Sequence, residues 1–128
     1  HLNRFESRYA GAPAAPKAQA AGIKKHPSAL VAQDKARGVL RTWEPVKADG
    51  SHFGCGIIVD PAGLTEFAEA DGNVLAVTRL PAGAEVTYYA GSGWDRGGDF
   101  GAVADWDRYL ADAARRVKSP LAVSVTTR

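Results

Sequence analysis

The fold of this 128-residue chain depends most on one stretch, Tyr88-Tyr89-Ala90-Gly91-Ser92-Gly93-Trp94-Asp95-Arg96-Gly97-Gly98-Asp99-Phe100. Its aromatic start, which follows two β-branched residues, predicts a strand. Four glycines within eight residues then predict a loop whose backbone can come close to a ligand or to another chain. The loop presents Trp94, Asp95 and Arg96 together, and aromatic rings offer the flat faces on which sugars dock. The alternative is a strand-to-helix connection whose aromatic side chains belong to the core.

Short strands separated by turn signals precede this stretch. The predicted strands are His1 to Tyr9, Lys17 to Lys24, Gly38 to Glu44, Phe53 to Val59, Val74 to Leu80 and Glu85 to Ala90. The Asp49-Gly50 turn predicts a hairpin between the strands on either side of it, and a turn at 81–84 joins the last two strands into a pair. We expect segment 10–16 to be a loop, segment 27–35 to be irregular and segment 64–70 to form a short helical turn.

One amphipathic helix follows the stretch. Its apolar stripe has spacings of three and four residues and consists of Val103, Trp106, Leu110, Ala113 and Val117. Asp99 is the expected N-cap, Pro120 is the stop signal, and Leu121 to Thr127 alternate as a last strand. Together these elements predict a mainly β fold. We expect an antiparallel β-sandwich portion with one C-terminal amphipathic helix, in a single domain over residues 1–128.

Composition narrows the class of protein. Sixteen basic and fourteen acidic residues give a net charge of +2, and no basic stripe is interleaved with aromatic residues, so we expect no nucleic-acid partner. The apolar runs have only the length of strands, which argues against a membrane span.

The single Cys55 excludes an internal disulfide and is expected to be a small buried hydrophobe. The sequence has no metal-ligand cluster and no phosphate or dinucleotide loop, so no cofactor is expected. It contains no methionine, and we therefore expect a processed chain or a fragment.

His26 is the titratable residue that we favour as a catalytic group. It follows two lysines, and Pro27 holds it in an extended conformation. The lysines favour its neutral form, which can accept a proton; the alternative is a surface histidine in a basic turn. His52, beside the Asp49-Gly50 turn, is expected to be solvated.

Residues around the glycines supply candidate binding groups. Tyr88 and Tyr89 point to opposite faces of their strand, and each is a candidate general acid or a core aromatic with a satisfied hydroxyl. Trp94 is a sugar-stacking platform or a plug that closes the end of the sandwich. Asp95 can bind sugar hydroxyls, exchange protons or cap the local turn, and Arg96 can hold a substrate carboxylate.

The order of motifs resembles a known family. The matching pieces are Gly22-Ile23-Lys24-Lys25-His26-Pro27, Gly38-Val39-Leu40-Arg41-Thr42-Trp43-Glu44, Gly54-Cys55-Gly56-Ile57-Ile58-Val59-Asp60-Pro61, Tyr88-Tyr89-Ala90-Gly91-Ser92-Gly93-Trp94-Asp95 and Asp105-Trp106-Asp107-Arg108-Tyr109-Leu110 with Ser119-Pro120-Leu121. They cover nearly the whole chain and are similar to a bacterial family named as a domain of unknown function. Its genes lie among those for degrading pectin- and ulvan-like acidic polysaccharides. Members are several times longer, and their C-terminal part looks like a β-sandwich of the sugar-mutarotase type. The resemblance implies that this chain corresponds to the C-terminal third of such a protein, periplasmic or secreted.

The resemblance also implies a function on acidic, uronate-containing oligosaccharides. The expected chemistry is elimination or dehydration, with His26 as base and Tyr89 as acid. Lys25 and Arg96 are expected to hold the carboxylate, Trp94 to stack on the sugar, and Tyr88 and Asp95 to line the binding site. Glycoside hydrolysis ranks lower, because it needs two facing carboxylates. The alternatives are a non-catalytic carbohydrate-binding sandwich and a structural half-domain that is completed by a second polypeptide or by a missing N-terminal part.

Overall fold

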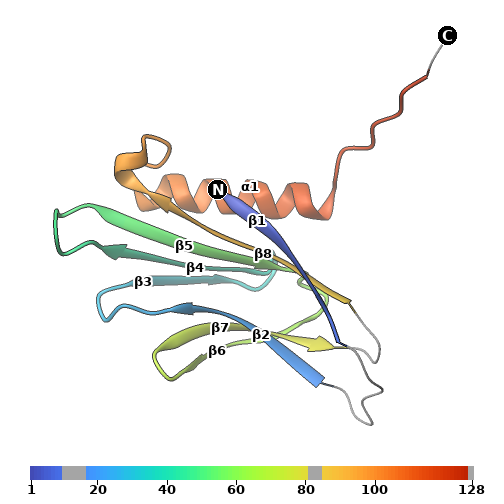
Figure 1. Cartoon of the computed structure of the whole chain (residues 1–128), viewed down its shortest axis with the longest axis horizontal. Coiled ribbons are helices and arrows are strands. Elements are labelled where there is room, and N and C mark those ends of the chain that lie inside the picture. The colour runs from blue at the N-terminus through green and yellow to red at the C-terminus, as the bar shows by residue number, and fades with distance from the viewer. Residues whose placement is uncertain (10–16, 81–84, 127–128) are drawn as a thin grey trace.

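Two antiparallel sheets and one helix build the structure (Figure 1). The computed structural model describes residues 1–9, 17–80 and 85–126. The strands within these residues are β1 (Leu2–Arg8), β2 (Lys17–Lys24), β3 (Leu30–Asp34), β4 (Val39–Pro45), β5 (His52–Val59), β6 (Leu64–Ala70), β7 (Asn73–Leu80) and β8 (Glu85–Trp94). The 3₁₀ turn η1 (Asp95–Gly97) and the helix α1 (Val103–Lys118) follow β8. The predicted fold class, mainly antiparallel β with one C-terminal helix, is confirmed.

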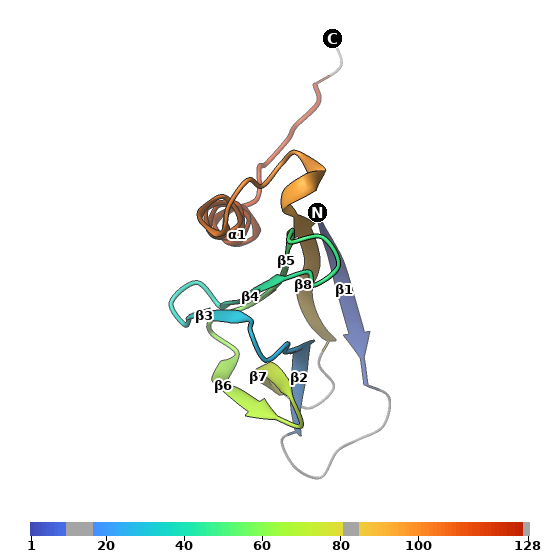
Figure 2. The same cartoon turned by 90° about the vertical axis from the view of Figure 1, so that its left-hand side faces the viewer.

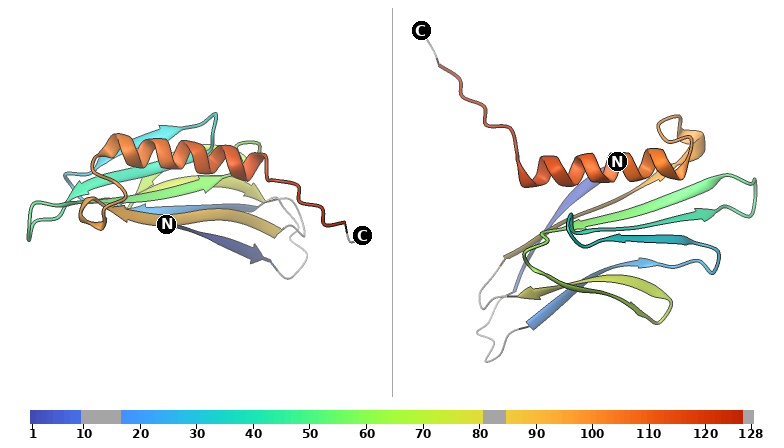
Figure 3. Two further views of the ribbon diagram at one scale, coloured as in Figure 1. Left: turned by 90° about the horizontal axis from the view of Figure 1, so that it is seen from above. Right: turned by 180° about the vertical axis from the view of Figure 1, so that it is seen from behind.

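Strand pairing brings distant parts of the chain together in three layers. The larger sheet has the order β1-β8-β5-β4-β3 and the smaller sheet the order β2-β7-β6. The predicted hairpin at Asp49-Gly50 is confirmed, because β4 and β5 pair antiparallel around it. Figure 2 shows the smaller sheet on one side of the larger sheet and α1 on the other. In Figure 3, α1 extends along the outer face of the larger sheet.

The layer between the two sheets is apolar, because alternate residues of each strand point into it. Its buried side chains are Ala21, Ile23, Leu40, Ile57, Val59, Leu64, Val74 and Ala76. Leu40 and Val74 have no exposed surface at all. Cys55 packs against this cluster from β5 and is half-buried. Burial raises the pKa of its thiol.

A second apolar layer lies between the larger sheet and α1. Trp106 and Leu110 of the predicted helical stripe are buried there against Trp43 and Ile58 of the sheet. Val117, at the end of the stripe, is exposed. The helix is also tied to β4 by Arg41, which donates to both carboxylate oxygens of Asp107 at 2.5 and 3.0 Å.

Glycines in the larger sheet make room for this helix layer. A Cβ on Gly54 would lie 2.8 Å from Cδ1 of Trp106, and a Cβ on Gly93 would lie 2.5 Å from Cδ2 of Phe100. Carbon atoms in ordinary contact are about 3.5–4.0 Å apart. A side chain at either position would therefore push the helix layer away from the sheet.

The predicted glycine-rich loop is wrong, because β8 continues through Gly91 and Gly93 to Trp94. Gly91 lies opposite Leu2 on one side and Gly56 on the other. The missing side chains let the chain pack closely against itself. Gly91 and Gly93 therefore let β1 and the helix layer pack closely against β8, and they do not provide space for a ligand.

Three further strand predictions are corrected. Segment 64–70 forms β6 at an edge of the smaller sheet and not a helical turn, and the stretch expected to be irregular contains β3. Pairing with a neighbouring strand outweighs local preference in both segments. The strands β7 and β8, expected to form a pair, lie in different sheets. The loop predicted at 10–16 and the turn predicted at 81–84 lie outside the described residues.

The start of α1 and the segment that follows the helix also differ from expectation. The N-cap is Ala102 and not Asp99, and the Asp105 carboxylate accepts the Ala102 N–H at 3.0 Å. Asp99 instead pairs with the His1 ring. Residues 119–126 form no strand, and Leu121 is almost fully exposed, because none of the strands in the described residues pairs with this segment. Thr127 lies outside the described residues.

None of the helices described is long and apolar enough to cross a membrane.

Candidate functional site

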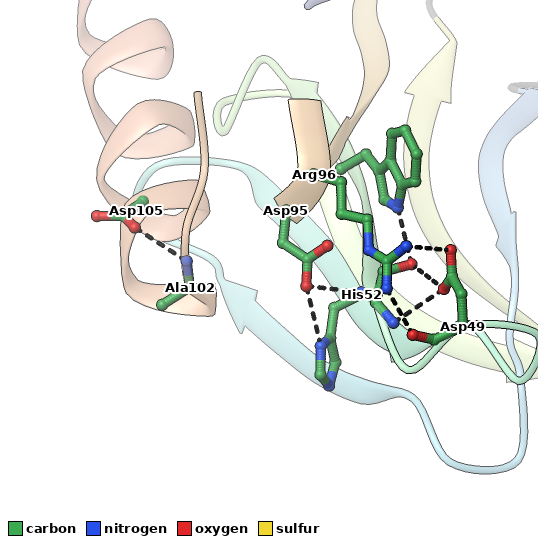
Figure 4. Close-up of polar contacts among 8 residues, drawn as sticks. Asp49, His52, Asp95, Arg96, Ala102 and Asp105 are labelled. Atoms are coloured by element: carbon green, nitrogen blue, oxygen red, sulfur yellow. Dashed lines mark hydrogen bonds and ion pairs between the residues drawn. The ribbon is translucent and has the colours of Figure 1, made fainter. Parts of the chain in front are cut away.

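Side chains of the β4–β5 hairpin lie against those that follow the end of β8, and Figure 4 shows Asp49 and His52 beside Asp95 and Arg96. Asp49, Ser51 and His52 come from the hairpin, and Trp94, Asp95 and Arg96 come from β8 and η1. We call them the hairpin cluster. The register places Phe53 opposite Trp94, so the two segments leave the sheet side by side. Three residues predicted as binding groups therefore lie together with three that were not.

Asp95 holds His52 through a single carboxylate oxygen. Its Oδ2 accepts the backbone N–H of His52 at 2.8 Å and lies 3.2 Å from the ring nitrogen Nδ1 (Figure 4). A carboxylate oxygen can only accept, so Nδ1 carries the proton. The other oxygen, Oδ1, is buried and accepts no hydrogen bond from any residue that the structure describes. Asp95 therefore fixes both the position and the tautomer of the His52 ring.

The His52 ring presents its second nitrogen to solvent. The ring stacks on Trp43 with centroids 6.0 Å apart and planes 5° from parallel. The His52 side chain is 44% exposed, whereas the Asp95 side chain is 19% exposed. With Nδ1 protonated, Nε2 carries the free lone pair. An exposed imidazole with a half-buried carboxylate behind it is the arrangement of a general base.

Trp94 and Arg96 are fixed to the same hairpin. The indole Nε1–H of Trp94 donates to the Ser51 hydroxyl at 2.9 Å, and that hydroxyl donates to Asp49 at 2.5 Å. Arg96 donates to the Asp49 carbonyl at 2.6 Å and lies 3.2 Å from its carboxylate. Hydrogen bonds from Ser51, together with the Arg96 charge, hold the pKa of Asp49 below its usual value. Trp94 nevertheless remains 43% exposed, so its edge is anchored while much of its surface is open.

Lys25 and His26 lie in the β2–β3 connection, outside the hairpin cluster. Lys25 forms an ion pair with Glu69 at 2.7 Å. The backbone N–H of His26 points at the Glu44 carboxylate, 3.4 Å away. The ring nitrogen Nδ1 of His26 accepts the Ser28 N–H at 3.1 Å. A neutral His26 therefore carries its proton on Nε2 and uses its lone pair inside the loop, which is the opposite arrangement to that of His52.

The two tyrosines point to opposite faces of β8, as predicted. Tyr88 packs against the cluster between the sheets and stacks on Phe5 at 5.0 Å. Tyr89 packs on the helix side of the larger sheet. His26 follows β2 of the smaller sheet, on the other side. The structure does not bring His26 and Tyr89 together as a base and acid pair.

Residues 1–123 match one protein family, described as Domain of unknown function (DUF4861). The chain belongs to this family. No similar curated protein and no similar solved structure was found. The DUF4861 match confirms the predicted resemblance to a family of unknown function, while the link to acidic polysaccharides rests on that resemblance alone.

The sequence of this DUF4861 chain does not single out Asp49, Ser51 or His52 as site residues. His52 is solvated as expected, with its side chain 44% exposed, but its contact with Asp95, 43 positions further along, is not predicted. No signal in the sequence marks this contact, because it depends on the pairing that brings the start of β5 beside the end of β8. No group of three or more metal-binding side chains occurs in the described ranges. The cluster therefore offers proton transfer, an aromatic face and a cation.

Proposed function

We propose that this DUF4861 chain is part of a carbohydrate-active protein that acts on acidic oligosaccharides at the hairpin cluster. The observation that carries the proposal is the Asp95–His52 pair beside a half-exposed Trp94. The pair supplies an oriented base, and the indole supplies a platform for a sugar ring. The single family match is compatible with this function and does not assign it.

The substrate contacts follow from exposure. Trp94 is held through its Nε1–H, so its face stays available for a sugar ring. The Arg96 guanidinium pairs with Asp49 yet is 53% exposed. It can therefore meet a uronate carboxylate from the solvent side, in the charge-assisted geometry that arginine favours. A saccharide bound across both groups lies next to His52.

The proposed reaction is elimination. The Nε2 lone pair of His52 takes the proton from the carbon next to the carboxylate. The released electron pair forms a carbon–carbon double bond while the C–O bond to the leaving group breaks, and the leaving oxygen takes a proton from solvent. Asp95 stabilises the imidazolium that forms. His26 is less suited to this role, because its Nδ1 lone pair is already used by Ser28.

Uronate oligosaccharides incubated with the chain test this reaction through the ultraviolet absorbance of an unsaturated product. His52→Ala keeps the backbone bond to Asp95 and should slow the reaction by about 10²- to 10⁴-fold. His26→Ala is the matched control and should leave the rate within about twofold, a change well below that of a lost general base. Trp94→Ala should weaken saccharide binding in calorimetry. A rate that depends on His26 and ignores His52 would refute the assignment.

A second candidate is a non-catalytic saccharide-binding module. It is favoured by the placement of Tyr89, which leaves the hairpin cluster without the expected acid. Such a module binds oligosaccharide through Trp94 and produces no new absorbance. Binding that survives His52→Ala, without turnover in the unmodified chain, would support it over the enzyme.

A further inference from the structure

A cavity of about 1010 Å³ lies between the C-terminal half of α1 and the larger sheet. None of its lining residues belongs to the hairpin cluster. Its apolar lining includes Ile58 of β5 and Ala111, Ala114 and Val117 of α1. Tyr89 also lines it. The volume is at the upper end of what small-molecule sites occupy, about 300–1,000 Å³.

The polar part of the lining is mostly basic. Five cationic residues reach the cavity: Arg4 from β1, Arg37 from the β3–β4 turn, and Arg108, Arg115 and Lys118 from α1. Two acids, Asp60 and Asp112, also line it. The cations come from three separate parts of the chain, and three of them, Arg108, Arg115 and Lys118, share α1. Folding therefore gathers at this cavity cations that lie far apart in the sequence.

The four arginines are paired, but their pairs are exposed. Their partners are Glu6, Asp34, Asp105 and Asp112, and of these only Asp112 lines the cavity. The arginine side chains are 56% to 77% exposed. Exposed ion pairs contribute little to stability, so an incoming oxyanion can compete for these guanidinium groups.

We propose that this cavity is a binding site for a small ligand that carries at least two oxyanion groups on a body with an apolar face. Arginine binds carboxylate, sulfate and phosphate groups in a planar, bidentate geometry. Arg4 and Arg37 approach from the sheet side and the other cations from the helix, so a ligand with two oxyanion groups can contact cations on both sides. The apolar lining contacts the body of the ligand. This site is separate from the hairpin cluster and does not depend on the function proposed for it.

The test is an NMR titration of the whole chain with citrate, which carries three carboxylates, at constant ionic strength. Acetate, inorganic sulfate and inorganic phosphate are titrated in parallel to separate the kinds of oxyanion. The amides of α1 beyond Arg108 and of Arg37 should shift and saturate with citrate. Acetate should bind at least about tenfold more weakly, because it occupies one guanidinium only.

Two arginine substitutions distinguish citrate binding at the cavity from diffuse electrostatic attraction of citrate to the chain. Arg115→Gln removes a lining cation and should weaken citrate binding by roughly fivefold or more. Arg116→Gln removes the same charge from the same helix and from the same partner, Asp112, but does not line the cavity. It should change affinity by less than about twofold.

Three outcomes would overturn the proposal. Shifts that grow linearly without saturation would show only diffuse attraction. Equal losses of citrate affinity in Arg115→Gln and Arg116→Gln would also show only diffuse attraction. Loss of the citrate response in Trp94→Ala would place the anion at the hairpin cluster instead.

Discussion

Two histidines near the same end of the sheets differ in the nitrogen that carries the proton. His52 donates from Nδ1 to a carboxylate, whereas His26 accepts a backbone N–H at Nδ1. The sequence favoured His26 because lysines and a proline surround it. It could not show that Asp95 lies behind His52, since that contact depends on strand pairing. The aromatic and charged part of the cluster, Trp94 to Arg96, was predictable because its residues are consecutive.

The reactivity of the Cys55 thiol depends on its burial. Burial, and then the charge of Glu44, raise the pKa of its thiol. Because a higher pKa leaves less thiolate at neutral pH, and thiolate is the reactive form, alkylation by iodoacetamide should be slow in the folded chain. We expect a rate at least about tenfold below that of the denatured chain. Equal rates in both states would contradict the burial of this residue.

At the scale of elements, the sequence pattern missed two strands, β3 and β6, which both lie at a sheet edge, although it predicted the edge strands β1 and β2. β4, β5 and β7 lie close to their predicted bounds. β6 is rich in alanine and glutamate, so its sequence resembles a helical turn. In the structure, a register shift between Leu64 and Glu66 also breaks the alternation of its side chains. Segment 121–126 alternates correctly but finds no partner strand. Pairing, which the sequence does not display, decides both segments.

The seating of α1 on glycines can be tested directly. Gly93→Ala places a methyl group against the Phe100 ring and should cost about 1–3 kcal/mol of unfolding free energy, as overpacked cores do. Gly97→Ala is the matched control, because no atom lies within 4 Å of its added Cβ, and should change stability by no more than about 0.5 kcal/mol. Urea denaturation measures both. Equal effects of the two substitutions would contradict the close contact at Gly93.

At the scale of the whole molecule, the larger sheet contributes to both apolar layers. Leu40 is buried on one face and Trp106 is packed against the other. We therefore expect a single cooperative transition, which is also what a single domain predicts. Leu40→Ala should cost about 2–5 kcal/mol and Trp106→Ala about 3–5 kcal/mol.

Thermal unfolding followed by backbone and by aromatic circular dichroism measures this cooperativity. Both signals should change together, in the unmodified chain and in each variant that folds. Loss of the helical signal at a lower temperature than loss of the strands would show that α1 is a separate unit. That result would remove the support that the sheet gives to the cavity.

The function proposed for the hairpin cluster depends on Asp95 orienting His52 as an exposed base. The most direct measurement is a long-range ¹H–¹⁵N correlation spectrum of the imidazole rings, recorded at a pH where both rings are neutral. We predict a protonated Nδ1 and a free Nε2 for His52, the reverse for His26, and loss of the His52 preference in Asp95→Asn. A His52 ring that carries its proton on Nε2 in the unmodified chain would contradict the account.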